Sequence, residues 1–324
     1  MGRYIAKRLG QALIVLLLAY TLAFFLLSAL PSDGVAARYA DPALGLSNTE
    51  IAQIREQMGV DKPLIEQYFA TLGGLFTGNL GYSVATGTPV SSLIATATPH
   101  TFVLAVSSVG LAIVVALAVA WVATLPGGGV IRRGFRALPS FMVSLPGFFI
   151  AIVLLQVFSF QLGWVNVVNP TAFEGLILST LTLVVPMAAP LIQVLIRSID
   201  EVQAKPFVQV LRARGASESR IFWRDVLRNA LLPAITMAGL LFGELVGGAV
   251  VTETVFGRAG LGQLTVNAVS SRDMPVLLGV VLIAAAAYVI INLVVDLLYP
   301  VLDVRLRDTT STATEKTPAK EGAK

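Results

Sequence analysis

Six apolar stretches, each about as long as a lipid bilayer is thick, constrain the fold of this chain more than any other feature of its sequence. A hydrocarbon core about 30 Å thick requires roughly 20 helical residues at about 1.5 Å each. Stretches of this length lie near residues 9–30, 101–124, 138–159, 176–196, 231–252 and 276–299. Each must be helical, because only intrahelical hydrogen bonds satisfy backbone groups that face lipid. The sequence therefore predicts an all-α integral membrane protein with six transmembrane helices.

The composition supports a membrane protein and excludes several kinds of site. Hydrophobic residues make up 56% of the 324 residues and charged residues 13%, against roughly a quarter charged in a typical soluble domain. Without cysteine, the chain has neither disulfides nor thiolate metal ligands. The single histidine, His100, lacks a second histidine for a metal site and a nearby Ser or Cys nucleophile, so we interpret it as an interfacial side chain.

Two details qualify the predicted spans. Prolines within the third and fourth stretches, Pro146, Pro186 and Pro190, predict kinks that pack against neighbouring helices. Basic residues precede the first stretch, as in a secretory signal, but its apolar run of about 22 residues exceeds a signal core, so we expect a retained helix.

The distribution of Lys and Arg predicts the orientation. If six helices alternate, 18 of the 23 basic residues fall on one side, which should be cytoplasmic and hold both termini. The five on the outer side are Arg38, Arg55, Lys62, Arg258 and Arg272. This bias explains the net charge of +4, and we expect no nucleic-acid partner because no aromatic-basic RNA motif is present.

The spans divide the chain into four parts. These are an N-terminal transmembrane helix (1–30), an external loop with short helices (31–99), a five-helix core (100–300) and a cytoplasmic tail (301–324). Residues 308–324 lack large apolar side chains and should be disordered.

The external loop carries signals for two short helices. Ser47 and Glu50 have the spacing of a capping box, and Asp61 with Pro63 predicts a second helix start. The loop could simply cap the bundle or could dock an external binding protein.

A charged segment at 198–230 emerges from the membrane between the fourth and fifth stretches. Phe207, Val210 and Leu211 fall on one side of a short helix that Gly215 should end. A helix this short is marginal alone in water, so we expect a groove on a partner protein to accept its apolar side. Beyond it, Arg220, Arg224 and Arg228 form a basic stripe suited to lipid headgroups or acidic partner residues, or belong to an ordinary interfacial helix.

The chain shows no catalytic constellation. It has no GxxxxGK[ST] phosphate loop, so we expect ATP and Mg²⁺ to bind a partner and no cofactor to bind here. Two carboxylates, Glu244 and Asp296, lie within apolar spans, where an unpaired charge usually faces a bundle interior or an aqueous path. We interpret Asp296 as structural. For Glu244, near Gly243, Gly247 and Gly248, either a translocation-path role or a buried interhelical hydrogen bond is open.

Several segments in the same order resemble the membrane subunits of the peptide and nickel group of bacterial ABC importers. They are DKPLIEQY and GNLGYS in the external loop, RARG at 212–215, LRNALLP at 227–233, ETVFGRAGLGQL at 253–264, RDMPVLLGVVL at 272–282 and NLVVDLLYPVLDVRLR at 292–307. Two departures stand out: Gln209, Val210 and Leu211 occupy the Glu-Ala-Ala positions of the broader family, and Asp303, Val304 and Arg305 replace a usual Asp-Pro-Arg.

The resemblance implies a type I ABC importer permease of MetI-like architecture in the bacterial inner membrane. Its cytoplasmic coupling helix, in the position of the EAA loop, would dock on an ATPase through Phe207, Val210, Leu211, Arg212, Ala213, Arg214, Gly215 and Ala216. The partners implied are a second homologous permease, two ATP-binding subunits and an external peptide-binding protein. The implied cargo is short peptides, with nickel as the alternative within the group. From other classes, an ion-coupled secondary transporter would need intramembrane titratable groups, of which only Glu244 and Asp296 are available. An intramembrane hydrolase is disfavoured because the single histidine lies at a membrane edge.

Overall fold

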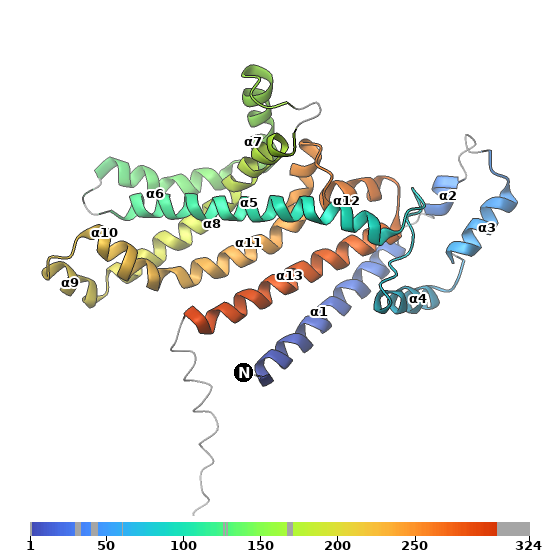
Figure 1. Ribbon diagram of the computed structural model, residues 1–324, viewed down its shortest axis with the longest axis horizontal. Helices are drawn as coiled ribbons and strands as arrows, with labels where there is room; N and C mark the ends of the chain where they lie inside the picture. Colours follow the sequence, from blue (N-terminus) through green and yellow to red (C-terminus); the bar gives the residue numbers. More distant parts are fainter. Residues whose placement is uncertain are drawn as a thin grey trace, which may run out of the picture.

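The computed structural model describes residues 2–29, 34–39, 45–59, 61–125, 127, 129–166 and 171–302, which form long helices joined by short loops (Figure 1). Within these residues, five helical segments are long and apolar enough to cross a membrane. They are α1 (Gly2–Ser28), α5 (Val90–Thr124), α8 (Ala172–Gln203), α11 (Leu227–Val255) with the α10 (Glu218–Arg220) and η3 (Ile221–Val226) turns before it, and α13 (Met274–Leu302).

The third apolar stretch does not form the single helix predicted over 138–159. Instead α6 (Gly129–Ser144) and α7 (Gly147–Leu154), which continues as the π-helix η2 (Leu155–Gln161), meet at an angle of 97°. Pro146 explains the break: it has no N–H to donate, disfavours a helical residue before it, and adopts extended angles (φ −63°, ψ 137°) at the start of α7. Counted as one span, the bent pair brings the total to six.

The second spanning helix is longer than predicted. α5 begins at Val90, ahead of the expected edge at residue 101, and runs through Pro99 and His100. The polar residues of this first part hid it from an apolar-length criterion. α8, by contrast, remains one helix through Pro186 and Pro190.

Small side chains let the central helices α5, α8 and α11 pack closely. The buried core there is rich in alanine, including Ala112, Ala116 and Ala120 of α5, Ala188 and Ala189 of α8, and Ala230 and Ala249 of α11. In a membrane, close van der Waals packing of this kind replaces the hydrophobic driving force. α1 and α13 lie side by side at the edge of this core (Figure 1).

The bundle has two distinct ends (Figure 1). One, called here the α12 end, holds α2 (Gly34–Tyr39), α3 (Asn48–Met58), α4 (Leu64–Phe76) and α12 (Leu261–Ser270). The opposite one, the α9 end, holds α9 (Pro206–Ala213) and α10.

The short helices predicted in the external loop are confirmed. α3 begins with the Ser47–Glu50 capping box, in which each residue's side chain accepts a hydrogen bond from the other's backbone N–H, and α4 begins directly after Pro63. The predicted disorder of residues 308–324 and the Asp303–Arg305 departure lie outside the described residues, as does the side chain of Asp296.

Candidate coupling site

The helix α9 begins and ends at residues suited to those positions. Pro206 occupies its first turn, where a missing N–H costs nothing. Beyond its end, Gly215 has φ +79°, a left-handed conformation that favours glycine. The Ala216 N–H donates to the Leu211 carbonyl (3.1 Å) and the Gly215 N–H to that of Arg212 (2.9 Å), which is the Schellman pattern. The predicted helix stop at Gly215 is therefore confirmed.

The two faces of α9 differ from the expected pattern in one respect. Val208 is fully buried, and Leu211 is half-buried with Ala216 against the main core. Phe207 and Val210 are exposed, Val210 by 51%. Leu211 thus packs inward and does not share the outward side with Phe207 and Val210. Val208, three residues before Leu211, also packs inward, and the sequence did not single it out. Arg212, Ala213 and Arg214 are exposed.

An ion pair fixes α9 to the segment that follows. The Arg212 guanidinium donates to both carboxylate oxygens of Glu218, with distances of 2.7 Å from Nε and 3.1 Å from Nη2. The Glu218 hydrogen bonds raise the pKa of Arg212 above its ordinary value, so it stays charged. Ser217 accepts a hydrogen bond from the Arg220 N–H and caps α10. The α9–α10 hairpin is therefore held as one unit.

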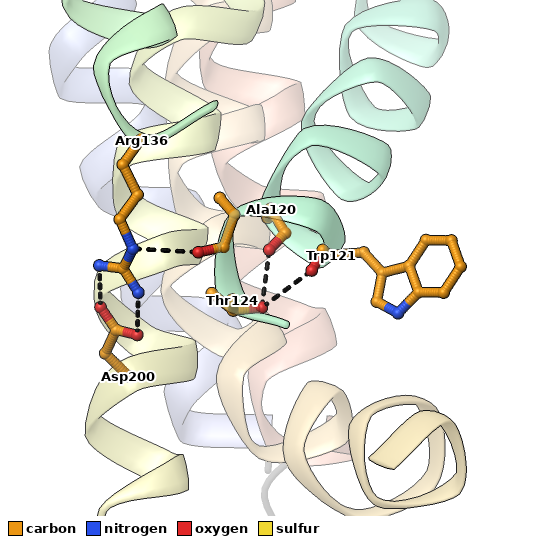
Figure 2. A network of polar contacts seen from close by, with 6 residues as sticks. Ala120, Trp121, Thr124, Arg136 and Asp200 are labelled. Carbon is orange, nitrogen blue, oxygen red and sulfur yellow. Dashed lines mark hydrogen bonds and ion pairs between the residues drawn. The ribbon is translucent and has the colours of Figure 1, made fainter. Parts of the chain in front are cut away.

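A second ion pair, between Arg136 and Asp200, lies near the end of α8 (Figure 2). The Arg136 guanidinium of α6 binds both oxygens of Asp200 at 2.7 Å, and its Nε donates to the Ala123 carbonyl of α5 at 3.0 Å. Asp200 is six residues before Pro206. The last turns of α5 and α8 and the middle of α6 are thereby tied together close to α9.

At the α12 end, a buried carboxylate organises the turn between α11 and α12. Glu253 accepts hydrogen bonds from the Thr101 hydroxyl (2.6 Å) and from the N–H groups of Gly262 (2.7 Å) and Gln263 (3.3 Å). The Thr101 oxygen accepts in turn from the Leu261 N–H (2.8 Å). Together they satisfy the N-terminal donors of α12. A side chain at position 262 would overlap the α11 backbone and approach this carboxylate.

A second buried carboxylate joins two of the motifs that carried the resemblance. Asp273 accepts hydrogen bonds from the Ser83 hydroxyl, from the Ala85 N–H (3.2 Å) and from the Val276 N–H (3.4 Å) in the first turn of α13. Ser83 ends GNLGYS and Asp273 belongs to RDMP. The sequence reasoning missed both carboxylates, although each lies in a motif it had singled out.

Glu244, the candidate path residue, lies exposed on α11. Among the described residues it has no hydrogen-bond or ion-pair partner, so an interhelical hydrogen bond within this chain is not formed. Two glycines of the same helix pack closely on α13, since a Cβ at Gly239 would overlap Val295 and one at Gly243 would overlap Tyr288. The close contact expected at Gly243 is thus present, and Glu244 is left uncovered by it.

Comparisons with known proteins agree with this architecture. Residues 109–308 match the family described as binding-protein-dependent transport system inner membrane component, and residues 1–105 match its N-terminal family. A glutathione transport system permease protein, GsiC of Pectobacterium atrosepticum, is 35% identical over 310 residues, covering 95% of this chain and 99% of that protein. A probable peptide ABC transporter permease protein, y4tP of Sinorhizobium fredii, is 34% identical over 315 residues, covering 95% and 100%.

The fold also has a solved counterpart. A chain from the inward-facing MetNI methionine ABC transporter superposes with a TM-score of 0.56 at 20% identity, covering 65% of this chain and 96% of that chain. The predicted MetI-like fold is therefore confirmed. The chain belongs to the family of binding-protein-dependent transport system inner membrane components, the permease subunits of ABC importers.

Proposed function

We propose that this chain forms half of the membrane pore of an ATP-driven importer for short peptides. The observation that carries the proposal is similarity over nearly the whole chain to permeases described as carrying glutathione, a tripeptide, or peptides. The other half would be a second, homologous but non-identical permease. Two ATPase subunits would bind ATP and Mg²⁺, because this chain has no phosphate loop of its own.

The α9 end of this chain would face the cytoplasm. The positive-inside bias supports this orientation, since the loops with most of the Lys and Arg lie there. The start of α1 and the end of α13 point away from the α2–α4 helices (Figure 1), which is consistent with both termini being cytoplasmic. The α12 end, with α2–α4, would then face the external binding protein.

α9 would be the coupling helix. Its outward face presents Phe207 and Val210 to solvent at the end of the bundle, while Val208 and Leu211 fix its inward face. An apolar pair on a short, well-anchored hairpin fits a groove on an ATPase, as helices docked in grooves do. Closure of two ATPases on ATP would then move α9 together with α8.

Glu244 would line the translocation path. An exposed carboxylate within an apolar span is costly against lipid, so the partner permease or water must cover it. Transport measured with Glu244→Gln tests this role, and unchanged rate and cargo preference would remove it.

The functions attributed to the relatives favour peptide cargo over nickel. Membership of this family does not favour an ion-coupled transporter or a hydrolase. The test is reconstitution of the complex into proteoliposomes with cargo-loaded binding protein. Uptake of labelled peptide should require ATP and survive a protonophore. Uptake driven by a proton gradient without ATP would refute the mechanism, and uptake of Ni²⁺ instead of peptide would refute the cargo.

A further inference from the structure

The arrangement of Arg136 links three helices at a single side chain. Its Nη1 and Nη2 form a fork with the Asp200 carboxylate (Figure 2). Its Nε donates to the Ala123 carbonyl. Ala123 lies in the last turn of α5, where carbonyls have no intrahelical donor. Arg136 therefore supplies a bond that α5 needs while it holds α8.

This arrangement differs from an ordinary surface ion pair on the same helix. Arg197 and Glu201 are well exposed, are four residues apart on α8, and connect that helix only to itself. Arg136 and Asp200 are only partly exposed (31% and 39%), come from α6 and α8, and form two parallel bonds that fix the relative orientation of the groups. Only the second pair can pass a displacement from one helix to another.

The position of Asp200 connects this link to α9. Asp200 lies in the last turn of α8, and its carbonyl accepts from the Ala204 N–H (3.1 Å) just before α9 begins. A displacement of α9 therefore reaches Asp200 through less than two helical turns. An open groove of about 400 Å³ beside the pair, lined by residues of α6 and α8, leaves one side of the contact without packing. The ion pair is thus the polar connection between α6 and α8 at this groove.

From this geometry we infer that Arg136 is a positioning residue for energy coupling, which makes α5 and α6 follow α8 when the ATPases move α9. The inference rests on the proposed coupling role of α9. It assigns to Arg136 no contact with cargo or ATP. Its effect should therefore appear in how much ATP each transported peptide costs, and not in whether the complex assembles.

The test compares Arg136→Gln with the matched control Arg197→Gln in the reconstituted complex. ATP hydrolysed per peptide transported should rise about tenfold for Arg136→Gln, within the range known for substitutions that weaken coupling, and stay near the wild-type value for Arg197→Gln. Arg136→Lys should recover part of the loss, because lysine keeps the charge but cannot form the fork. Asp200→Asn serves as a second variant if Arg136→Gln fails to assemble.

A second readout follows the helices themselves. Because the chain has no cysteine, spin labels can be placed on introduced cysteines at Ser140 of α6 and Glu201 of α8, both exposed. Their separation should stay constant between the ATP-free and ATP-trapped wild type, and should change between these states in Arg136→Gln.

Two results would overturn the inference: an unchanged ATP-to-peptide ratio in Arg136→Gln and Asp200→Asn, or equal effects of Arg136→Gln and Arg197→Gln. A merely structural role would lower assembly and transport while leaving that ratio unchanged. Failure of the proposed function is distinguishable, because the wild type itself would then show no ATP-dependent uptake.

Discussion

The two ends of the bundle differ in how they hold the acidic side chains that link their helices. At the α12 end, Glu253 and Asp273 are 0% and 2% exposed, and hydroxyl and backbone N–H groups satisfy them. At the α9 end, the Asp200 and Glu218 side chains are 39% and 36% exposed, and arginines bind them. Removing a buried acceptor strands its donors, whereas a partly exposed ion pair contributes roughly 1 kcal/mol or less. This difference favours an α12 end that stays fixed and an α9 end that moves, as the proposed coupling role of α9 requires.

This difference agrees with the proposed roles of the two ends, binding-protein docking at the α12 end and ATPase coupling at the α9 end. Glu253 binds the start of α12 and connects it to α5, and Asp273, in the turn after α12, connects that turn to the external loop. α9 has only one fully buried side chain, Val208. A moving part needs contacts that can break and re-form, while the surface on which a binding protein docks benefits from being preorganised.

The largest effect on stability is expected from Glu253→Ala. The substitution leaves the buried Thr101 hydroxyl and Gly262 N–H, and the part-buried Gln263 N–H, without an acceptor. The free energy of unfolding should fall by about 3 kcal/mol or more. Thermal unfolding in detergent measures this loss. Glu244→Ala, on an exposed residue of the same helix, is the control and should change little. Equal stability of the two variants would remove the distinction between the ends.

Two glycine substitutions, one at each end of the bundle, compare the effects of an added Cβ on stability and on uptake. Gly262→Ala places a Cβ against the α11 backbone at Val250 and should cost about 1–3 kcal/mol of stability. Gly215→Ala meets no neighbouring atom but strains a residue with φ +79°, at a cost of about 1–2 kcal/mol.

Unfolding and ATP-driven uptake should therefore rank these two variants in opposite orders. Gly262→Ala should lose more stability, because the atoms its Cβ overlaps belong to the backbone of α11. Gly215→Ala should lose more uptake, because Gly215 shapes the helix that we propose docks on the ATPase. The same ranking in both assays would contradict the assignment of the two ends.

Much of this fold was predictable because a membrane span is a local property of the sequence. Length and apolarity located the first, second, fourth, fifth and sixth helices. They predicted a kink at Pro146 but not a break of 97° between α6 and α7. The angle between these two helices depends on the neighbouring helices against which each of them packs. The glycine stop at 215 was predictable for the same local reason, a backbone conformation that favours glycine.

The candidate site was harder to predict, because its contacts are distant in sequence. Glu253 and Thr101 are 152 residues apart, and Arg136 and Asp200 are 64 apart, so no local pattern pairs them. On α9, Val208 and Leu211 are no more apolar than Phe207 and Val210, and only packing against η3 and the main core decides which pair is buried. The motif around Glu253, with glycines at 260 and 262, was the available signal for a crowded buried group.

A smaller stability effect, with a large functional one, is expected on the outward face of α9. Val210→Asp alters a side chain that is already exposed, so the free energy of unfolding of the isolated chain should change by about 0.5 kcal/mol or less. The ATPase should nevertheless be lost on co-purification, because a charge would enter its groove. Gln209→Asp, adjacent on the same helix, is the matched control. Retention of the ATPase by Val210→Asp would show that this face does not dock.

The smallest effect concerns an exposed carboxylate at the otherwise rigid α12 end. Hydrogen bonds from the Ser47 N–H and hydroxyl lower the pKa of Glu50 in the folded protein. The stabilisation of α3 by this cap is therefore fully present above the ordinary glutamate pKa of about 4.3. It is lost as the pH falls through the lower pKa of the folded state. Hydrogen exchange at the first amides of α3 should therefore show weaker protection below about pH 4, and Glu50→Gln should remove this pH dependence. If the protection of α12 fell over the same pH range, the pH dependence would not be specific to the cap of α3, and it could not be assigned to Glu50.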